Sequence, residues 1–192
     1  MAIDQKFIDQ FVNVTSKAAL ASYFLVGKKD KVGADKAAVD AMRNELNQLD
    51  INGEIVIGEG ELDEAPMLYI GEKIWTMNGT EIDIAVDPLE GTNFAANNLP
   101  GALSVIAIAE KNNLFNAPET YMQKISTKVS DKEVVDLDYS VKKNIFNLSE
   151  YLNKKPEKLT ACIMDRPRHK DIINELRTIG VKIKFISDGD VS

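Results

Sequence analysis

The sequence predicts an α/β protein whose first domain is of the α+β type. Helical periodicity marks the amino-terminal region, short apolar runs typical of strands follow it, and a strand–helix–strand pattern occupies the last part of the chain. With 192 residues, 44% of them hydrophobic, the chain can form one large or two small packed domains. We therefore expect a mixed helix-and-sheet domain over residues 1–157. Residues 158–192 are expected to be the first βαβ unit of an α/β domain that is incomplete in this chain.

Two amphipathic helices are predicted near the amino end. The first has apolar residues at alternating spacings of four and three and ends near Gly27. The second is predicted to begin at about Asp35. The apolar face of the first consists of Phe7, Phe11, Val14, Ala18, Ala21 and Leu25, and that of the second of Val39, Met42, Leu46 and Leu49.

Strands are predicted after these helices, over residues 54–57, 82–86 and 103–109. Asp87 then falls at the carboxyl end of the second strand, where ligands of open α/β sheets usually bind. A hairpin turn at residues 111–113 is expected to lead into a short partner strand at 114–115. Residues 119–140 are interpreted as sheet edge and loop.

In the last part of the chain, the residue pattern predicts a helix over residues 141–152 and then a βαβ unit. Its strands are expected at 159–164 and 181–186 and its helix at 170–179, with the two strands parallel. No helix follows to close the layer before Ser192, so one face of this small sheet is expected to be uncovered. Either further residues or a partner chain would cover it, and we expect a homo-oligomer.

Composition excludes several classes of function. The chain has 30 acidic and 23 basic residues and a net charge of −7, which argues against a nucleic-acid-binding surface. Its apolar stretches are shorter than the roughly 18 to 20 residues of a membrane span. The amino end lacks the pattern of a secretory signal, so a cytoplasmic location is expected.

Residues 87–92, with the sequence Asp-Pro-Leu-Glu-Gly-Thr, form the most informative motif. Pro88 fixes the backbone and Gly91 allows close approach, so Asp87 and Glu90 can turn toward one point. Two carboxylates held so close repel each other unless a cation lies between them, and oxygen ligands suit Mg²⁺ or Mn²⁺. The alternative interpretation is an ordinary turn with solvated charges.

Further carboxylates stand at predicted element ends. Asp35 begins a helix, and Glu59 and Glu61 close a strand. Taken singly, Asp35 is a good N-cap residue. The two glutamates lie in a glycine-rich turn, where exposed charged side chains would simply be solvated. Taken together they favour a site, because Gly58 and Gly60 indicate close backbone approach beside Glu59.

The chain resembles the bacterial class II fructose-1,6-bisphosphatases. Blocks that match this family occur in family order at residues 31–35, 55–68, 87–92, 116–122, 166–169 and 188–190. The motif at 87–92 alone would indicate only the wider superfamily, which includes inositol monophosphatases. The combination of blocks is specific and spans nearly the whole chain.

The resemblance implies a layered αβαβα sandwich, with the second layer incomplete in this chain. It also implies hydrolysis of the C1 phosphate of fructose 1,6-bisphosphate to fructose 6-phosphate, as in gluconeogenesis, and in some relatives of sedoheptulose 1,7-bisphosphate. Asp35 and Glu59 would hold one divalent ion, Mn²⁺ or Mg²⁺, and Asp87 and Glu90 another. Thr92 would position or help to deprotonate the attacking water, so that Thr92, Asp87 and Glu59 form the catalytic group.

The resemblance also implies a set of substrate contacts. Arg166 and Arg168 would bind the distal phosphate, and Asp188 and Asp190 the sugar hydroxyls. The alternatives are a solvated loop for the arginines and a simple turn for the two aspartates. The whole set is Glu90, Gly91, Thr92, Tyr121, Arg166, Pro167, Arg168, Asp188, Gly189 and Asp190.

The family continues past position 192, where it supplies a further glutamate ligand and a glycine-containing substrate loop. We therefore expect the full-length parent to be an active bisphosphatase and this polypeptide alone to be impaired. Two other readings stay open. One is an inositol or nucleotide monophosphatase of the same superfamily, and the other is a non-catalytic, truncated interaction module.

Overall fold

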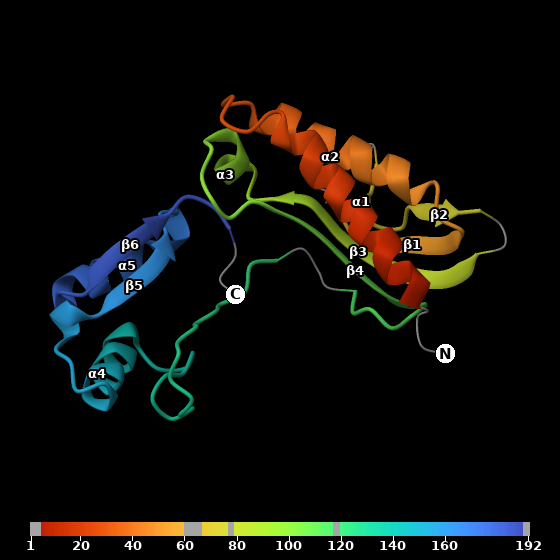
Figure 1. The fold of residues 1–192 in the computed structure, drawn as a ribbon. Helices are drawn as coiled ribbons and strands as arrows, with labels where there is room; N and C mark the ends of the chain where they lie inside the picture. The colour runs from red at the N-terminus through yellow and green to blue at the C-terminus, as the bar shows by residue number, and fades with distance from the viewer. Residues whose placement is uncertain (1–4, 60–66, 77–78, 117–119, 190–192) are drawn as a thin grey trace. The chain divides into compact units, whose positions relative to one another are not determined.

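The computed structural model describes residues 5–59, 67–76, 79–116 and 120–189, which belong to two compact units (Figure 1). The first unit is Met1–Thr120 and the second is Tyr121–Ser192. The fold is mixed α/β, as the sequence predicts. The units divide at residues 120 and 121 and not near 157, because the helix predicted at 141–152 packs with the following βαβ unit. The functional division at 157 stays a prediction.

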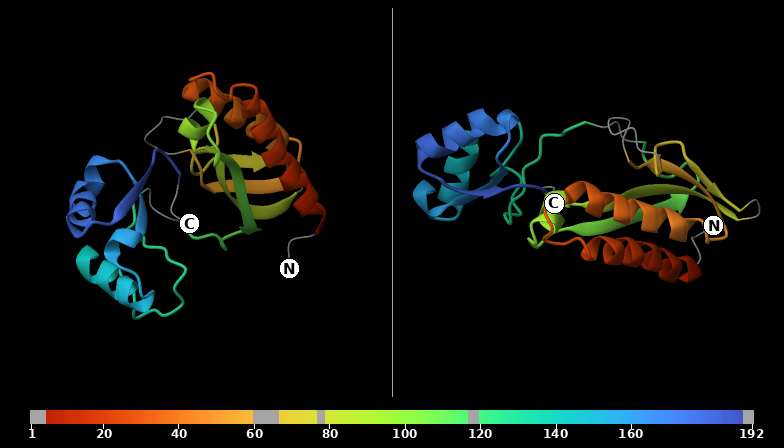
Figure 2. Two further views of the ribbon diagram at one scale, coloured as in Figure 1. Left: turned by 60° about the vertical axis from the view of Figure 1, so that its left-hand side comes forward. Right: turned by 90° about the horizontal axis from the view of Figure 1, so that it is seen from above.

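The first unit is built on a four-stranded sheet in the order β2-β1-β3-β4. Its strands are β1 (Ile51–Ile57), β2 (Lys73–Trp75), β3 (Thr80–Glu90) and β4 (Leu103–Glu110). β1 and β3 are parallel, while β2 and β4 run antiparallel to their neighbours. Helices α1 (Gln5–Tyr23) and α2 (Lys31–Leu46) pack together on one face of this sheet (Figures 1 and 2). The three predicted strands are confirmed, and β2 is an addition.

The core of the first unit lies between the two helices and the sheet. Burial alternates along β1, where Ile51 and Ile55 are buried and Asn52 and Glu54 are not, as period two requires. The predicted helical faces are also confirmed in the main. The buried members of these faces are Phe7, Phe11, Val14, Ala18, Val39, Met42, Leu46 and Leu49.

Helix α2 begins earlier than the sequence predicts. Asp30 occupies its N-cap, and the side chain of Asp30 accepts a hydrogen bond from the Gly33 backbone N–H at 2.8 Å. Asp35 therefore lies inside the helix, and the prediction that it opens the helix is wrong. This also removes the N-cap explanation for the carboxylate of Asp35.

Strand β3 runs through the Asp87 motif, which the sequence placed at the end of the strand. Pairing with β4 is regular as far as Asp87, shifts between Asp87 and Glu90, and resumes where Glu90 pairs with Leu103. This irregularity is a β-bulge at Pro88, which has no N–H to contribute to the ladder and is tolerated where regular pairing is interrupted. The chain leaves the strand at Gly91 and enters the short helix α3 (Thr92–Ala96).

The second unit contains the predicted βαβ pattern. Strands β5 (Thr160–Met164) and β6 (Lys182–Ile186) are parallel and are joined by α5 (Lys170–Ile179), and α4 (Val141–Tyr151) packs on α5. Two short 3-10 helices, η2 (Pro156–Lys158) and η3 (Pro167–His169), flank β5. The expected sheet edge is wrong for the described residues at 114–116 and 120–140, which contain no strand. In the described ranges no helix combines the length and apolar character of a membrane span.

Candidate active site

Glu59 and Asp87 lie at corresponding positions where the parallel pairing of the inner strands β1 and β3 ends. The parallel pairing of β1 with β3 ends with Ile57 opposite Ala85. Two residues further along the chain from this pair come Glu59, just past the end of β1, and Asp87, still in β3, so both follow the last paired residues of the two strands on the same side. This is the arrangement that the sequence predicts, although it arises inside β3.

Gly58 allows the backbone beside Glu59 to be approached closely. A Cβ at position 58 would lie 2.1 Å from the backbone oxygen of Leu68, which is far inside contact distance. That same oxygen accepts a hydrogen bond from the Glu59 N–H at 2.9 Å. The expected close approach at Gly58 is therefore confirmed, while Gly60 and Glu61 lie outside the described residues.

Asp35 reaches this region because α2 packs against α3. The loop before α2 is also tied to α3 by the backbone, since the Lys29 N–H donates to the Ala96 oxygen at 2.9 Å. α3 follows directly on the 87–92 motif. The first part of α2 is thus held next to the carboxylates of β3.

The electrostatics of Asp87 show that the predicted carboxylates interact. Burial raises the pKa of Asp87 above its ordinary value, and the negative charges of Glu59 and Asp35 raise it further. Hydrogen bonds with the side chain of Glu90 and with the Leu89 N–H, the latter at 3.1 Å, act in the opposite direction. The structure therefore places Asp35, Glu59 and Glu90 close enough to Asp87 for each of them to act on its carboxyl group.

This carboxylate group fits a hard divalent cation by the chemistry of its donors. Every member offers carboxylate oxygen, the ligand that Mg²⁺ and Mn²⁺ favour, and their crowding concentrates negative charge that a cation would offset. Within the described residues, no three His, Cys, Asp or Glu side chains form a ready-made metal-binding group. The residues therefore suit a divalent cation by the type of their donor atoms and by their negative charge.

Thr92 follows this group at the first position of α3. Its predecessor Gly91 is the N-cap and has a φ of 79°, in the left-handed region that suits glycine. A Cβ at Gly91 would also lie 2.8 Å from Cδ2 of Phe94. The turn that presents the Thr92 side chain after Glu90 thus requires glycine at position 91.

The predicted distal-phosphate residues gather in the second unit. The guanidinium of Arg168 lies 4.0 Å from the centroid of the Tyr121 ring, a cation–π contact. Arg166 precedes Pro167, the first residue of η3, and its Nη2 donates to the Ser187 backbone oxygen at 2.7 Å.

This last bond ties Arg166 to the segment that carries the predicted sugar contacts. Asp188 is half-buried, and Gly189 has a φ of 90°. Asp190 lies outside the described residues. The second unit therefore places two cationic side chains, an aromatic ring and a carboxylate in one region of its own.

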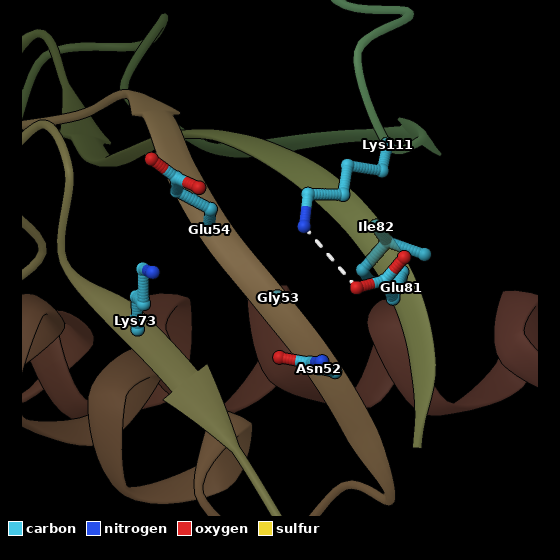
Figure 3. A pocket seen from close by; sticks show the side chains of 7 residues that line it. All are labelled: Asn52, Gly53, Glu54, Lys73, Glu81, Ile82 and Lys111. Atoms are coloured by element: carbon cyan, nitrogen blue, oxygen red, sulfur yellow. Dashed lines mark hydrogen bonds and ion pairs between the residues drawn. The ribbon is translucent and has the colours of Figure 1, made fainter. Parts of the chain in front are cut away.

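A separate hollow of about 140 Å³ lies on the sheet of the first unit (Figure 3). Its charged side chains balance each other, and the Lys111 Nζ pairs with Glu81 Oε1 at 3.1 Å. None of the predicted site residues lines it, so it belongs to the polar face of the sheet. Its lining is Asn52, Gly53, Glu54, Lys73, Glu81, Ile82 and Lys111.

Sequence reasoning missed an ion pair that joins helix α2 to the turn at residues 67–72. Arg43 of α2 donates through Nε to Oε1 of Glu72 at 2.8 Å, and Glu72 is only 9% exposed. No motif marks either residue, because Glu72 follows Gly71 in what reads as an ordinary turn. Only the folded chain shows that residues so far apart in sequence meet.

Together the fold and the carboxylate group define an α/β protein with an acidic site at the carboxyl end of the inner, parallel strands of its sheet. The sequence model of the family described as bacterial fructose-1,6-bisphosphatase, glpX-encoded, matches residues 5–192, and the chain belongs to this family.

The chain is also similar to curated proteins named D-fructose 1,6-bisphosphatase class 2/sedoheptulose 1,7-bisphosphatase. It is 50% identical to the protein of Synechococcus sp. strain CC9902 over 189 residues, which cover 98% of this chain and 57% of the relative. Identity to the protein of Synechococcus elongatus is 47%, over 95% of this chain and 56% of the relative. Identity to the protein of Prochlorococcus marinus strain MIT 9301 is also 47%, over 98% of this chain and 57% of the relative. The chain thus spans a little more than half the length of these relatives.

Proposed function

We propose that this chain belongs to a metal-dependent phosphoric monoester hydrolase that converts fructose 1,6-bisphosphate to fructose 6-phosphate and phosphate in carbohydrate metabolism. The observation that carries the proposal is that Asp35, Glu59 and Glu90 all act on the carboxyl group of Asp87, in a chain of the glpX-encoded family. The names of the relatives add sedoheptulose 1,7-bisphosphate as a second substrate to test.

Within this proposal the carboxylates hold divalent ions. Asp35 and Glu59 would bind one Mn²⁺ or Mg²⁺, and Asp87 and Glu90 a second. When bound, such ions lower the pKa of a coordinated water and offset the charge of the phosphoryl group. The Thr92 hydroxyl, which follows Glu90 by two residues, would orient the attacking water and take part in its deprotonation.

The remaining residues bind and orient the sugar bisphosphate. Arg166 and Arg168 present forked donors that suit the distal phosphate, and the Tyr121 ring steadies the Arg168 guanidinium. Asp188 would accept hydrogen bonds from sugar hydroxyls. Further proposed contacts are Glu90, Gly91, Thr92, Pro167, Gly189 and Asp190.

Several broader properties complete the proposal. We propose a layered αβαβα sandwich for the family, with metal binding assigned to residues 1–157 and substrate binding to 158–192. We also propose a cytoplasmic homo-oligomer. The mixed α/β elements and the acidic net charge of −7 are compatible with these assignments.

Phosphate release tests the proposal. Fructose 1,6-bisphosphate, sedoheptulose 1,7-bisphosphate and inositol 1-phosphate are supplied separately, with Mn²⁺, with Mg²⁺ or with a chelator. We expect metal-dependent release from the sugar bisphosphates and a loss of about a hundredfold or more in Asp87→Asn.

Glu81→Gln is the matched control, because Glu81 lies on the same strand, exposed and paired only with Lys111 among the contacts described. Its rate should equal that of the parent. A preference for inositol phosphate would instead support the inositol monophosphatase alternative. No phosphate release from any substrate, together with no Mn²⁺ binding, would overturn the proposal.

A further inference from the structure

The turn at residues 67–72 supports Glu59 through the backbone. Besides the bond from the Glu59 N–H to the Leu68 oxygen, the Gly71 N–H donates to the Ile55 oxygen at 2.7 Å. The Ile55 N–H in turn donates to the Glu72 oxygen at 2.9 Å. The position of Glu59 therefore depends on the shape of this turn.

That shape contains one strained residue. Leu68 is fully buried and has a φ of 59°, in the left-handed region that a branched side chain rarely occupies. A conformation of this kind persists only when surrounding contacts hold it in place. At Leu68 the contact is the carboxylate of Glu72, which accepts a hydrogen bond from the Leu68 N–H through Oε2.

The second oxygen of the Glu72 carboxylate is held by helix α2. Oε1 accepts from Arg43 Nε at 2.8 Å, and the side chains of Arg43 and Glu72 are 17% and 10% exposed. Hydrogen bonds with charged partners in such shielded places are stronger than those on the surface. One carboxylate thus joins α2 to the turn that carries Leu68.

We propose that the Arg43–Glu72 pair is a positioning device that sets the separation between Asp35 and Glu59. Asp35 lies on α2, and Glu59 is hydrogen-bonded to the turn that Glu72 closes, so the pair links the two supports. This inference rests on the proposed function, in which these two carboxylates share one divalent ion. Neither Arg43 nor Glu72 touches the ion or the substrate in this account.

The test uses the 192-residue chain and two readouts. Native-state hydrogen exchange reports on the Glu59 and Leu68 amides, and calorimetry with Mn²⁺ reports on binding. In Glu72→Gln and Arg43→Met we expect these two amides to exchange at least about tenfold faster, while the Ile82 and Ile84 amides of β3 change little. Mn²⁺ affinity should fall by about 10- to 100-fold, the usual effect of removing support from a ligand.

Two further variants serve as a charge-conserving replacement and as a control on the same helix. Arg43→Lys keeps a charge that can reach Glu72 and should restore part of the protection and affinity. Asp40→Asn breaks an exposed ion pair on the same helix, Lys36 to Asp40 at 3.1 Å, and should change neither readout.

The outcomes separate the inference from the function on which it rests. Equal acceleration of all amides of the first unit would show general destabilisation and overturn the positioning role. Unchanged exchange at Glu59 and Leu68 would overturn it as well. If the parent chain binds no Mn²⁺, the proposed function fails, while the exchange pattern still decides whether the pair fixes Glu59.

Discussion

A negative charge on Asp87 is disfavoured by the surroundings that the fold gives it. Burial acts first, and the charges of Glu59 and Asp35 add to it, although those residues come from other elements. The motif at 87–92 supplies only the opposing hydrogen bonds, from Leu89 and Glu90. The chemical character of this residue thus depends on neighbours that the motif does not contain.

Gly58→Ala should destabilise the first unit and disturb Glu59. The added methyl group would lie 2.1 Å from the Leu68 oxygen, so the turn at 67–72 must move and the Glu59 N–H must lose its acceptor. We expect the free energy of unfolding to fall by about 1–3 kcal/mol, as for other forced overpacking. Chemical denaturation followed by circular dichroism measures this change.

Gly71→Ala is the matched comparison within the same turn. Gly71 has a φ of 89°, but nothing lies within 4 Å of its missing Cβ. Its replacement should cost about 1–2 kcal/mol through backbone strain alone and leave Mn²⁺ affinity nearly unchanged. Equal loss of affinity in both alanine variants would contradict the steric explanation for Gly58.

Among the elements, helix α2 has three separate tasks. Its N-cap at Asp30 fixes where it begins, Asp35 faces the carboxylate group, and Arg43 holds Glu72. Its apolar face meanwhile buries Met42 and Leu46 completely against the rest of the core. A change at one end of this helix therefore has consequences for the acidic site as well as for stability.

Asp30→Ala removes the acceptor for the Gly33 N–H at the start of α2. We expect a loss of about 0.5–2 kcal/mol in unfolding free energy, with faster hydrogen exchange in the first turns of α2. Ser140→Ala provides the counterpart, because Ser140 caps α4 by accepting from the Lys143 N–H at 3.1 Å. That variant should affect amides of the second unit only, and an effect on α2 amides would count against local capping.

The elements also show how far the sequence can predict this structure. Helix α5 is predicted over its full extent, because apolar spacing and Gly180, a left-handed C-cap with a φ of 90°, both mark it. Strand β3 is predicted too short, because Pro88 signals a break and only the partner strand reveals a bulge. Short β2 and α3 lack enough residues to show a period.

The acidic site, too, could be predicted from the sequence only in part. Three of its carboxylates could be selected from the sequence, since Glu59 and Glu90 stand next to glycines and Asp87 follows an apolar run, whereas Asp35 is expected to open a helix and lies inside one. Their mutual contact could not, because it depends on the register of β1 with β3 and on the packing of α2 against α3. The Arg43–Glu72 pair gave no local signal at all, since it joins a helix to a distant turn.

At the scale of the whole molecule, the two units have separate hydrophobic cores. The first core extends from α1 and α2 across the sheet, whereas the second is centred on Leu159, Leu176 and Val181. The carboxylate group lies in the first unit, and the Tyr121–Arg168 contact lies in the second. Under the proposed function, metal binding and phosphate recognition would therefore belong to parts of the chain that are stabilised by separate cores.

Truncating one core should unfold its own unit first. Met42→Ala removes a fully buried side chain from the first core, and Leu176→Ala removes one that is 3% exposed from the second. Each should cost about 2–5 kcal/mol, and the small second core should lose its structure. Residue-resolved hydrogen exchange should show accelerated amides confined to the mutated unit. Uniform acceleration in either variant would indicate a single cooperative core.

Mn²⁺ should stabilise the first unit selectively. A ligand that binds only the folded state adds about 2.7 kcal/mol at a concentration one hundred times its dissociation constant. We expect slower exchange at β1, β3 and α2 in the presence of Mn²⁺, with little change in α4 and α5. Removal of the ion with a chelator should reverse the effect, and Asp87→Asn should abolish it. Slower exchange confined to α4 and α5 would place the ion elsewhere.

The passage of β3 through the 87–92 motif has a consequence for motion. Because Asp87 and Glu90 both lie in β3 and pair with residues of β4, neither can shift far without breaking hydrogen bonds between these two strands. Residues in such a place open only with the slowest and largest fluctuations of a domain. The backbone of Asp87 and Glu90 is therefore fixed by the strand pairing, and a substrate would meet these two carboxylates on a fixed surface and not on a loop that closes over it.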